Sequence, residues 1–320
     1  MKRREFIGLN LALGASAFAP NLFAKESLTI YGAPAIPSVI IAVAVLRGEL
    51  KKQKDLSLQI WKTPEQLRAG VANGTMQVMM SPSNVGVNLA NQGQDVAMLN
   101  LLTANVQDIV TKDENIKSIH DLEGKKLIMP FRNDMPDIIF NALCKKLGVD
   151  VKKISIDYTA TPPESMGMFL AKDYDAALLP EPMATAATFK AKQSGIKVFR
   201  MRPMQDIWGE AFGIKPIIPQ AGIIVKRDFY EKEKESLEIF HKDLQMAMEW
   251  IEQNPESAGK IGENYLPAKA PVLTQAFKNS DLIVVKASEA KSELMNLFEI
   301  IMEYNPKLLG GKLPNDEFFL

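Results

Sequence analysis

The sequence predicts an α/β protein of two lobes, in which parallel-type sheets are flanked by helices. Short apolar runs alternate with amphipathic stretches along the chain, which is the pattern of βαβ units. This alternation restarts once, near residue 116. With 320 residues, the chain is also long for a single hydrophobic core. Two successive α/β units therefore explain the pattern better than one.

The first unit extends from residue 27 to residue 102. Amphipathic stretches predict helices that begin near Ser38, Thr63 and Ser81. Thr63 has the features of an N-cap, because Pro64 follows it at the first helical position and Gln66 stands three residues on. Ser38 is a similar candidate for an N-cap. Apolar runs predict the intervening strands, at residues 27–31, 56–61, 77–80 and 96–102.

The second unit begins with a helical turn at residues 116–126, where Gly124 is the stop signal. Strands are predicted at residues 127–130, 154–158, 175–179 and 197–199. Helices are predicted at residues 134–147, 163–171 and 183–192. One further strand follows at 221–225, and the remainder of the chain is predicted to be helical, with amphipathic helices at 231–254 and 288–304.

The return strand after residue 219 predicts a discontinuous lobe. Two crossing segments, near residues 105–111 and 217–222, would form a hinge. We expect residues 25–108 and 219–320 to form the first lobe and residues 109–218 the second.

Residues 1–24 have the three parts of an export signal. Arg3 and Arg4 precede Phe6, a mildly apolar run follows at 9–19, and Ala24 marks a cleavage point. The run is too short for a membrane span, which needs about 20 residues. The arginine pair resembles a twin-arginine signal, which would make the twin-arginine translocase a partner during export. An ordinary secretory signal that happens to carry two arginines is the alternative.

Composition excludes several classes of function. The 38 basic and 38 acidic side chains balance, so no electrostatic surface for nucleic acid is predicted. The single cysteine, Cys144, allows no internal disulfide and is expected to be a buried small hydrophobe. His120 and His241 lie in charged contexts and are expected to be exposed. We predict neither a metal site nor a cofactor, since no metal-ligand spacing is present and the 16 methionines are more typical of core filling.

Several segments, in this order, resemble one family. They are Asn73-Gly74-Thr75, residues 81–89, the turn at 116–126 with Asp121-Leu122-Glu123-Gly124-Lys125-Lys126, and Leu179-Pro180-Glu181-Pro182. Together they resemble periplasmic substrate-binding proteins of ABC importers, in the nitrate/sulfonate/taurine and thiamine-precursor group (NitT/TauT, SsuA-like). The resemblance covers residues 28–304 and implies a type II periplasmic-binding-protein fold, a ligand in the cleft and permease subunits as partners. Residues 129–137 depart from the nitrate and sulfonate binders, so the ligand is left open.

Ligands of doubly wound sheets bind beyond the carboxyl ends of the strands, beside helix N-termini. The candidate ligand-binding residues at these positions are Gly32, Ala33, Pro34, Trp61, Ser81, Ser83, Asn84, Arg132, Asp134 and Glu181. Trp208 and Gln220, near the second crossing, are weaker candidates.

Six of these candidates have a second interpretation. Arg132 offers a bidentate fork to an anionic group, but it would also be able to tie Asp134 or Asp137 to its loop. Glu181 either accepts from a ligand amine or braces the opposite loop. Trp61 either stacks on a ring or belongs to the core or rim. Capping alone would explain Ser81 to Asn84.

The predicted function is capture of a small organic or oxyanionic ligand for an importer. Some menaquinone-pathway and pyrimidine-forming enzymes are similar to members of this fold superfamily, so an exported enzyme is an alternative. No acid–base set stands out in the sequence, and we therefore predict a protein that is not an enzyme. A ligand-sensing module for a receptor is the other alternative. We expect a soluble periplasmic monomer that is not a lipoprotein.

Overall fold

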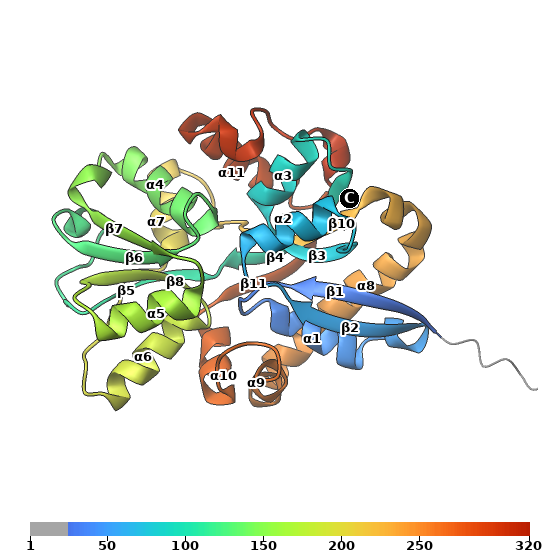
Figure 1. Cartoon of the computed structure of the whole chain (residues 1–320), viewed down its shortest axis with the longest axis horizontal. Helices are drawn as coiled ribbons and strands as arrows, with labels where there is room; N and C mark the ends of the chain where they lie inside the picture. Colours follow the sequence, from blue (N-terminus) through green and yellow to red (C-terminus); the bar gives the residue numbers. More distant parts are fainter. Residues whose placement is uncertain (1–24) are drawn as a thin grey trace, which may run out of the picture.

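The structure is a computed structural model that describes residues 25–320 (Figure 1). The predicted export signal at residues 1–24 lies outside the described residues. Two sheets organise the chain, and we call each sheet with its helices a lobe. The first lobe has a six-stranded sheet in the order β11-β4-β10-β3-β1-β2, and the second a five-stranded sheet in the order β7-β6-β8-β5-β9.

The strands of the first sheet are β1 (Glu26–Gly32), β2 (Lys54–Ile60), β3 (Val78–Pro82), β4 (Val96–Asn105), β10 (Ala221–Lys226) and β11 (Asp281–Lys286). The strands of the second are β5 (Gln107–Thr111), β6 (Lys126–Pro130), β7 (Ser155–Thr159), β8 (Ala176–Pro180) and β9 (Phe199–Arg200).

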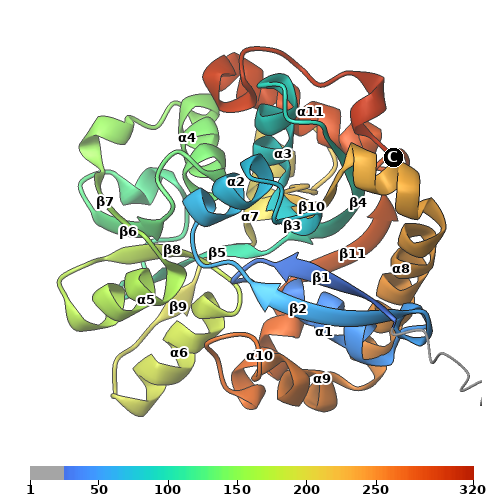
Figure 2. The same cartoon turned by 45° about the vertical axis from the view of Figure 1, so that its right-hand side comes forward.

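Helices flank both sheets, as predicted (Figures 1 and 2). Those of the first lobe are α1 (Ser38–Arg47), α2 (Pro64–Ala72), α3 (Ser83–Asn91), α8 (Arg227–Gln253), α9 (Pro255–Gly262), α10 (Ala270–Lys278) and α11 (Lys291–Tyr304). Those of the second are α4 (Met135–Leu147), α5 (Pro162–Ala171), α6 (Met183–Gln193) and α7 (Met204–Phe212). The apolar faces of these helices cover the sheets. As a result, nearly every residue of the strands β3, β4, β5 and β8 is buried.

The strands follow the predicted parallel arrangement except at β5 and β10, where the chain crosses between lobes, and at the edge strand β11. β1 pairs in parallel with β2 and β3, and β6 with β7 and β8. β5 runs antiparallel to β8, and β10 runs antiparallel to β3 and β4. Both crossings lie at the carboxyl edges of the sheets. A strand that starts at this edge must run opposite to strands that end there, so the position of the crossings explains the antiparallel direction of β5 and β10.

The expectation that the chain is helical after residue 225 is wrong for residues 281–286. These residues form β11, an edge strand that pairs antiparallel with β4. The run Leu282-Ile283-Val284-Val285 is short and rich in β-branched residues, which favours a strand. The amphipathic helices on either side hide this local signal. Residues 107–111, which the sequence placed in a crossing segment, form β5.

Of the two predicted N-caps, Thr63 and Ser38, the structure confirms only the first. The Thr63 side chain accepts a hydrogen bond from the Gln66 backbone N–H at 3.3 Å, and Pro64 follows it, as predicted. At α1 the N-cap is Pro37, so the prediction of Ser38 as N-cap is wrong. The Ser38 hydroxyl is buried and donates to the Ala33 carbonyl at 2.6 Å instead. Ser38 therefore fixes the loop after β1 rather than the end of the helix.

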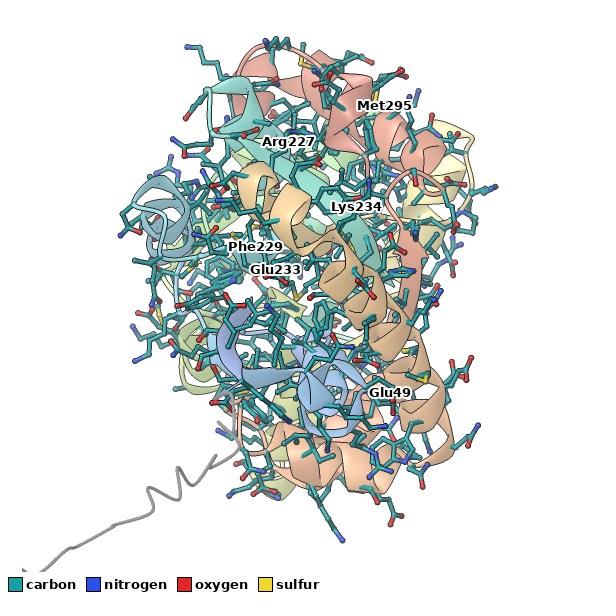
Figure 3. All side chains as sticks on the ribbon, turned by 90° about the vertical axis from the view of Figure 1, so that its right-hand side faces the viewer. Glu49, Arg227, Phe229, Glu233, Lys234 and Met295 are labelled. Carbon is teal, nitrogen blue, oxygen red and sulfur yellow. The ribbon has the colours of Figure 1, made fainter. Side chains whose placement is uncertain are left out.

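The long helix α8 runs along the outside of the first lobe, with Glu49 beside its lower half (Figure 3). Buried Asp243 on α8 accepts the backbone N–H groups of Glu49 at 2.8 Å and Leu50 at 2.9 Å. His241 is also buried, so the expectation that it is exposed is wrong. Its helix face packs against the sheet, where Nδ1 lies 3.4 Å from Asn100 Nδ2, and burial lowers the pKa of His241. His120 is exposed.

Cys144 is fully buried on α4, as predicted, and burial raises the pKa of its thiol to about 12. Such a thiol stays protonated at neutral pH and is a poor nucleophile. In residues 25–320, no helix is both long and apolar enough to span a membrane.

Candidate ligand-binding site

The carboxyl edges of the two sheets meet between the lobes (Figure 2). Strands β1 and β2 run toward the second lobe, and the Ile36 N–H in the loop after β1 donates to the Glu181 carbonyl at 2.9 Å. The Ile218 N–H of the second crossing segment donates to the Ala104 carbonyl near the end of β4 at 2.7 Å. The candidate residues therefore lie along one seam, with contacts that join the two lobes.

The loop Gly32-Ala33-Pro34 lies at the first-lobe side of this seam. A Cβ atom at Gly32 would come within 2.7 Å of both Ile60 Cδ1 and Ser38 Oγ, so this close packing needs glycine. Trp61 is 3% exposed, and its indole N–H donates to the Met80 carbonyl at 2.9 Å. The structure thus places Trp61 in the core, which is the second of its two interpretations.

Ser81, Ser83 and Asn84 lie at the junction of β3 and α3, and all three are buried. The Ser81 hydroxyl donates to the Pro82 carbonyl at 3.0 Å, and the Ser83 hydroxyl donates to the Pro219 carbonyl at 2.8 Å. Neither hydroxyl caps α3, whose N-cap is Pro82. Asn84 differs from its neighbours, because its Oδ1 is buried without a hydrogen-bond partner in the part of the chain that the structure describes.

The loop after β6 places Arg132 at the surface of the second lobe. Phe131 and Asn133 have φ angles of 62° and 61°, so two left-handed residues enclose Arg132 in a tight turn. Its guanidinium lies 5.3 Å from the centre of the Tyr158 ring, a cation–π contact. Asp137 is occupied by other donors, including the Asn133 N–H and the Tyr158 hydroxyl, each at 2.8 Å.

Asp134, two residues further on, pairs across the seam. Nη2 of Arg68, from α2 of the first lobe, lies 3.0 Å from Asp134 Oδ1 and 3.1 Å from Oδ2. Burial raises the pKa of Asp134 to about 6, while Arg68 acts in the opposite direction. Arg132 therefore does not tie Asp134 or Asp137 to the loop, because both carboxylates have other partners. Sequence reasoning missed Arg68, which lies in an ordinary amphipathic helix.

Glu181 is fully buried at the carboxyl end of β8. Its carboxylate accepts the Thr185 N–H at 3.0 Å and the Thr185 hydroxyl at 2.8 Å, and it pairs with Arg200 Nη2 at 2.6 Å. Arg200 also pairs with buried Asp108. Burial raises the pKa of both carboxyl groups, that of Asp108 to about 7, and Arg200 opposes the shift. The Glu181 side chain therefore interacts with Thr185 and Arg200 of its own lobe. Its backbone carbonyl accepts the hydrogen bond from Ile36 in the loop of the opposite lobe.

The crossing segments contribute two glutamines that face each other. Gln107 Nε2 donates to Gln220 Oε1 at 2.8 Å, and both residues are buried. Gln107 Oε1 and Gln220 Nε2 have no further partner within residues 25–320. Trp208 Nε1 is likewise buried and unpartnered among these residues. The sequence offered only a weak indication for Gln220 and Trp208, and none for Gln107, which begins an unpredicted strand.

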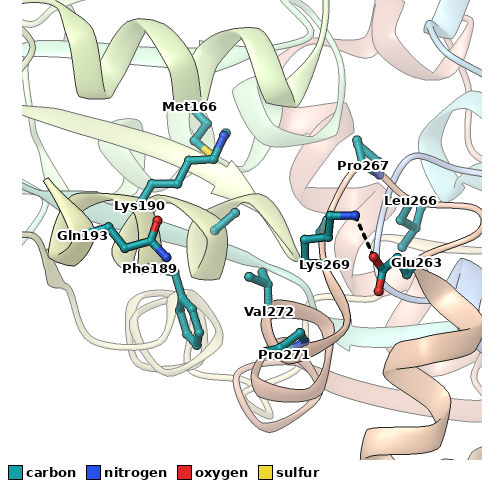
Figure 4. Close-up of a pocket in the computed structure, with 12 residues that line it drawn as sticks. Met166, Phe189, Lys190, Gln193, Glu263, Leu266, Pro267, Lys269, Pro271 and Val272 are labelled. Carbon is teal, nitrogen blue, oxygen red and sulfur yellow. Dashed lines mark hydrogen bonds and ion pairs between the residues drawn. The ribbon is translucent and has the colours of Figure 1, made fainter.

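A cavity of about 710 Å³ lies elsewhere between the lobes (Figure 4). It separates α6 from the loop between α9 and α10, and it is lined mainly by apolar atoms, with Phe189 on one wall and Leu266 on the other. Lys269 and Glu263 form an ion pair of 2.8 Å at its rim. None of the predicted binding residues lines this cavity.

The site holds charge and amides but no metal-ligating cluster. Within residues 25–320, no group of three or more His, Cys, Asp or Glu side chains could hold a metal ion. The described side chains at the seam make hydrogen bonds and ion pairs.

Known proteins share this architecture. An ABC transporter structure from Parabacteroides distasonis aligns with a TM-score of 0.74 and 18% identity, over 92% of this chain and 98% of that chain. The periplasmic aliphatic sulphonate-binding protein SsuA from Escherichia coli aligns with a TM-score of 0.71 and 15% identity, over 92% of both chains. A Candida albicans gene product, described as having the generic periplasmic binding protein structural fold, aligns with a TM-score of 0.60 and 12% identity, over 92% and 93%.

At these identities the structural likeness establishes the fold, and it confirms the predicted two-lobed periplasmic-binding-protein architecture. Among curated protein sequences, none matches the chain closely enough to count as a relative. The sequence profile of the NMT1/THI5-like family matches residues 51–258, which is well over half of the chain. This chain therefore belongs to the NMT1/THI5-like family.

Proposed function

We propose that this protein is a periplasmic solute-binding protein of an ABC importer. It captures a small organic or oxyanionic ligand between its two lobes and delivers it to permease subunits in the inner membrane. One observation carries the proposal. The carboxyl edges of both sheets, where ligands of such folds bind, enclose buried polar atoms at the crossing between the lobes that have no hydrogen-bond partner in the part of the chain that the structure describes. Groups of this kind are costly to leave unpaired, and a ligand would supply their partners.

The domain organisation that we propose has residues 25–106 and 219–320 in the first lobe and residues 107–218 in the second, so the expected boundary at 108 moves to the start of β5. Strand membership supports it, because β10 and β11 complete the sheet of β1–β4. The chain passes between the sheets in two places, through Val106 and through the segment before Ala221. Two such connections would allow the lobes to rotate about a hinge.

Arg132, Asp134 and the loop 32–34 are the proposed contacts at the mouth of the cleft. Arg132 is exposed and lacks a carboxylate partner among the described residues, so its guanidinium is available to a ligand. The names of the solved neighbours favour a binder, since they include a sulphonate-binding protein and an ABC transporter component. We propose a function in binding rather than catalysis, with no metal or cofactor.

Export to the periplasm belongs to the same proposal. Residues 1–24 would direct the chain there through the twin-arginine translocase, and the mature protein would be a soluble monomer without a lipid anchor. Changing Arg3 and Arg4 together to lysine keeps the charge and removes the motif, so we expect export of the double variant to stop. Normal export would indicate a general secretory signal.

Native mass spectrometry of the purified mature protein tests the binding function. We expect a bound small molecule of defined mass that is lost on unfolding. Small-angle scattering of the protein refolded without the molecule should give a larger radius of gyration than that of the loaded protein, because the lobes close on ligand. Loading should also raise the melting temperature. A radius and a melting temperature that stay the same in both states would contradict a hinged binder.

A further inference from the structure

We propose that three side-chain amides at the crossing, those of Asn84, Gln107 and Gln220, bind the ligand, and that the part of the ligand they hold is uncharged and offers both a hydrogen-bond donor and an acceptor. This inference rests on the proposed function and names the class of ligand. Amides, lactams and sulfonamides belong to this class.

Hydrogen bonds bring the three residues together although they come from distant parts of the sequence. Gln107 begins β5 and Gln220 precedes β10, and their side chains are joined by the hydrogen bond of 2.8 Å. The backbone N–H of Ser83 donates to the Gln220 carbonyl at 2.8 Å, which brings the first turn of α3, and therefore Asn84, to the same place. Each of the three residues is 2% exposed. The cluster thus combines both crossing segments with a helix start.

The three amides have both free acceptors and a free donor. Gln107 Oε1 and Asn84 Oδ1 are free acceptors and Gln220 Nε2 is a free donor, with no partner in the described part of the chain. Exchanging the oxygen and nitrogen of both glutamines would leave the same result, because an amide paired with an amide always keeps one free oxygen and one free N–H. A ligand that satisfies the pair must therefore present both a donor and an acceptor.

Charge argues against an oxyanion at this position. No charged side chain hydrogen-bonds to the three amides within residues 25–320. The nearby cations face elsewhere, because Arg200 pairs with Asp108 and Glu181, and Arg68 pairs with Asp134. An oxyanion has acceptors only, so it would face the free carbonyl oxygens without a proton to share, and its buried charge would lack a counter-charge.

A matched pair of probes tests the inference. Methanesulfonamide and methanesulfonate have nearly the same shape, but only the sulfonamide is neutral and carries an N–H donor. Protein that has been unfolded and refolded to remove co-purifying molecules is labelled with ¹⁵N and titrated with each probe. We expect methanesulfonamide to shift the side-chain amide resonances of Asn84, Gln107 and Gln220, and methanesulfonate to leave them in place at the same concentration.

A double variant tests the same residues independently. Gln107→Met with Gln220→Met replaces both partners of the pair by apolar groups of similar length, so neither amide is left alone. We expect the dissociation constant for methanesulfonamide to rise at least tenfold, with little change in the melting temperature. Gln53→Met, at an exposed position of the first lobe, is the matched control and should leave binding unchanged.

Two results would overturn the inference. One is a methanesulfonate response at these amides equal to or stronger than that of methanesulfonamide, and the other is the absence of any response to methanesulfonamide. Both results are read from the amide resonances of the parent protein, so the test does not depend on whether the double variant folds. In either case the proposed function survives if native mass spectrometry still finds a bound molecule and scattering still shows closure. It fails only if those two measurements fail.

Discussion

At the end of β3 in the six-stranded sheet the polar side chains are hydroxyls and an amide, whereas at the ends of β6 and β8 in the five-stranded sheet they include buried carboxylates. The first edge carries Ser81, Ser83 and Asn84, and its two hydroxyls donate to backbone carbonyls. The second edge carries Asp134 and Glu181, both buried. The seam therefore places an edge with buried carboxylates against one whose strand ends carry hydroxyls and amides, with Arg68 on α2 as the cation that faces Asp134.

This difference indicates that most charges at the second edge maintain structure. Glu181 is neutralised within its own lobe by Arg200, and only Asp134 finds its partner, Arg68, across the seam. Five buried polar atoms have no hydrogen-bond partner within residues 25–320. Asn84 Oδ1 lies at the first edge and Gln107 Oε1 and Gln220 Nε2 at the crossing, while Gln205 Oε1 and Trp208 Nε1 lie on α7 of the second lobe. The four changes below test this division of roles, beginning with the largest expected effect.

Arg200→Met should be the most damaging. It leaves the buried carboxylates of Asp108 and Glu181 without their shared cation, and removal of one partner of a buried ion pair costs about 3–5 kcal/mol. Arg202→Met is the control, because Arg202 pairs with Glu210 at an exposed position, where such pairs contribute about 0–1 kcal/mol. Urea unfolding measures both. Equal losses in the two variants would show that the buried network has no special structural role.

The pH dependence of stability tests the role of a buried carboxyl group, that of Asp108. The ordinary pKa of Asp108 is 3.8, and burial raises it to about 7 in the folded protein. Between these values the folded state holds a proton that the unfolded state releases, so the stability from this group is complete below about pH 4 and is lost as pH rises toward 7. We expect Asp108→Asn to reduce the fall in unfolding free energy between pH 5 and pH 7.5 by about 1 kcal/mol or more. Identical slopes for Asp108→Asn and the parent would contradict this assignment.

Arg68→Ala should open the ligand-free protein. The Arg68–Asp134 pair joins the lobes, but Arg68 is 38% exposed, so solvent screening reduces its contribution to about 1 kcal/mol. Such a loss changes the ratio of closed to open molecules about fivefold. Small-angle scattering should show a larger radius of gyration. Arg47→Ala, which removes a guanidinium that lies over Trp250 away from the seam, should leave the radius unchanged. A radius for Arg68→Ala equal to that of the parent would show that the pair does not hold the lobes together.

Arg132→Ala should have the smallest effect on stability. Its cation–π contact with Tyr158 is exposed, and such contacts contribute about 0.5–1 kcal/mol. We expect the melting temperature of the empty protein to change little. A loss above about 2 kcal/mol would show that Arg132 has a structural role and would weaken its assignment to the mouth of the cleft.

The sequence predicted the parts of the molecule that depend on local pattern. Periodicity and capping located Thr63 and the strands that end at the seam, because these signals lie within a few residues of each other. Contacts between distant segments had no such signal. Arg68 and Gln107 bond to residues that are distant in sequence, Asp134 and Gln220. His241 is buried because α8 packs against a sheet, and the sequence of the helix alone does not show this contact.

The position of β10 has a consequence for the synthesis of this chain. This strand lies inside the first sheet, between β3 and β4, yet it follows the whole second lobe in sequence. A growing chain that has not yet reached residue 221 can complete the second sheet but leaves β3 and β4 as unpaired edges. Exposed edges of this kind favour aggregation. The first lobe to begin synthesis is therefore the last to finish folding, and a chaperone that holds the nascent chain would be most needed before residues 221–226 emerge from the ribosome.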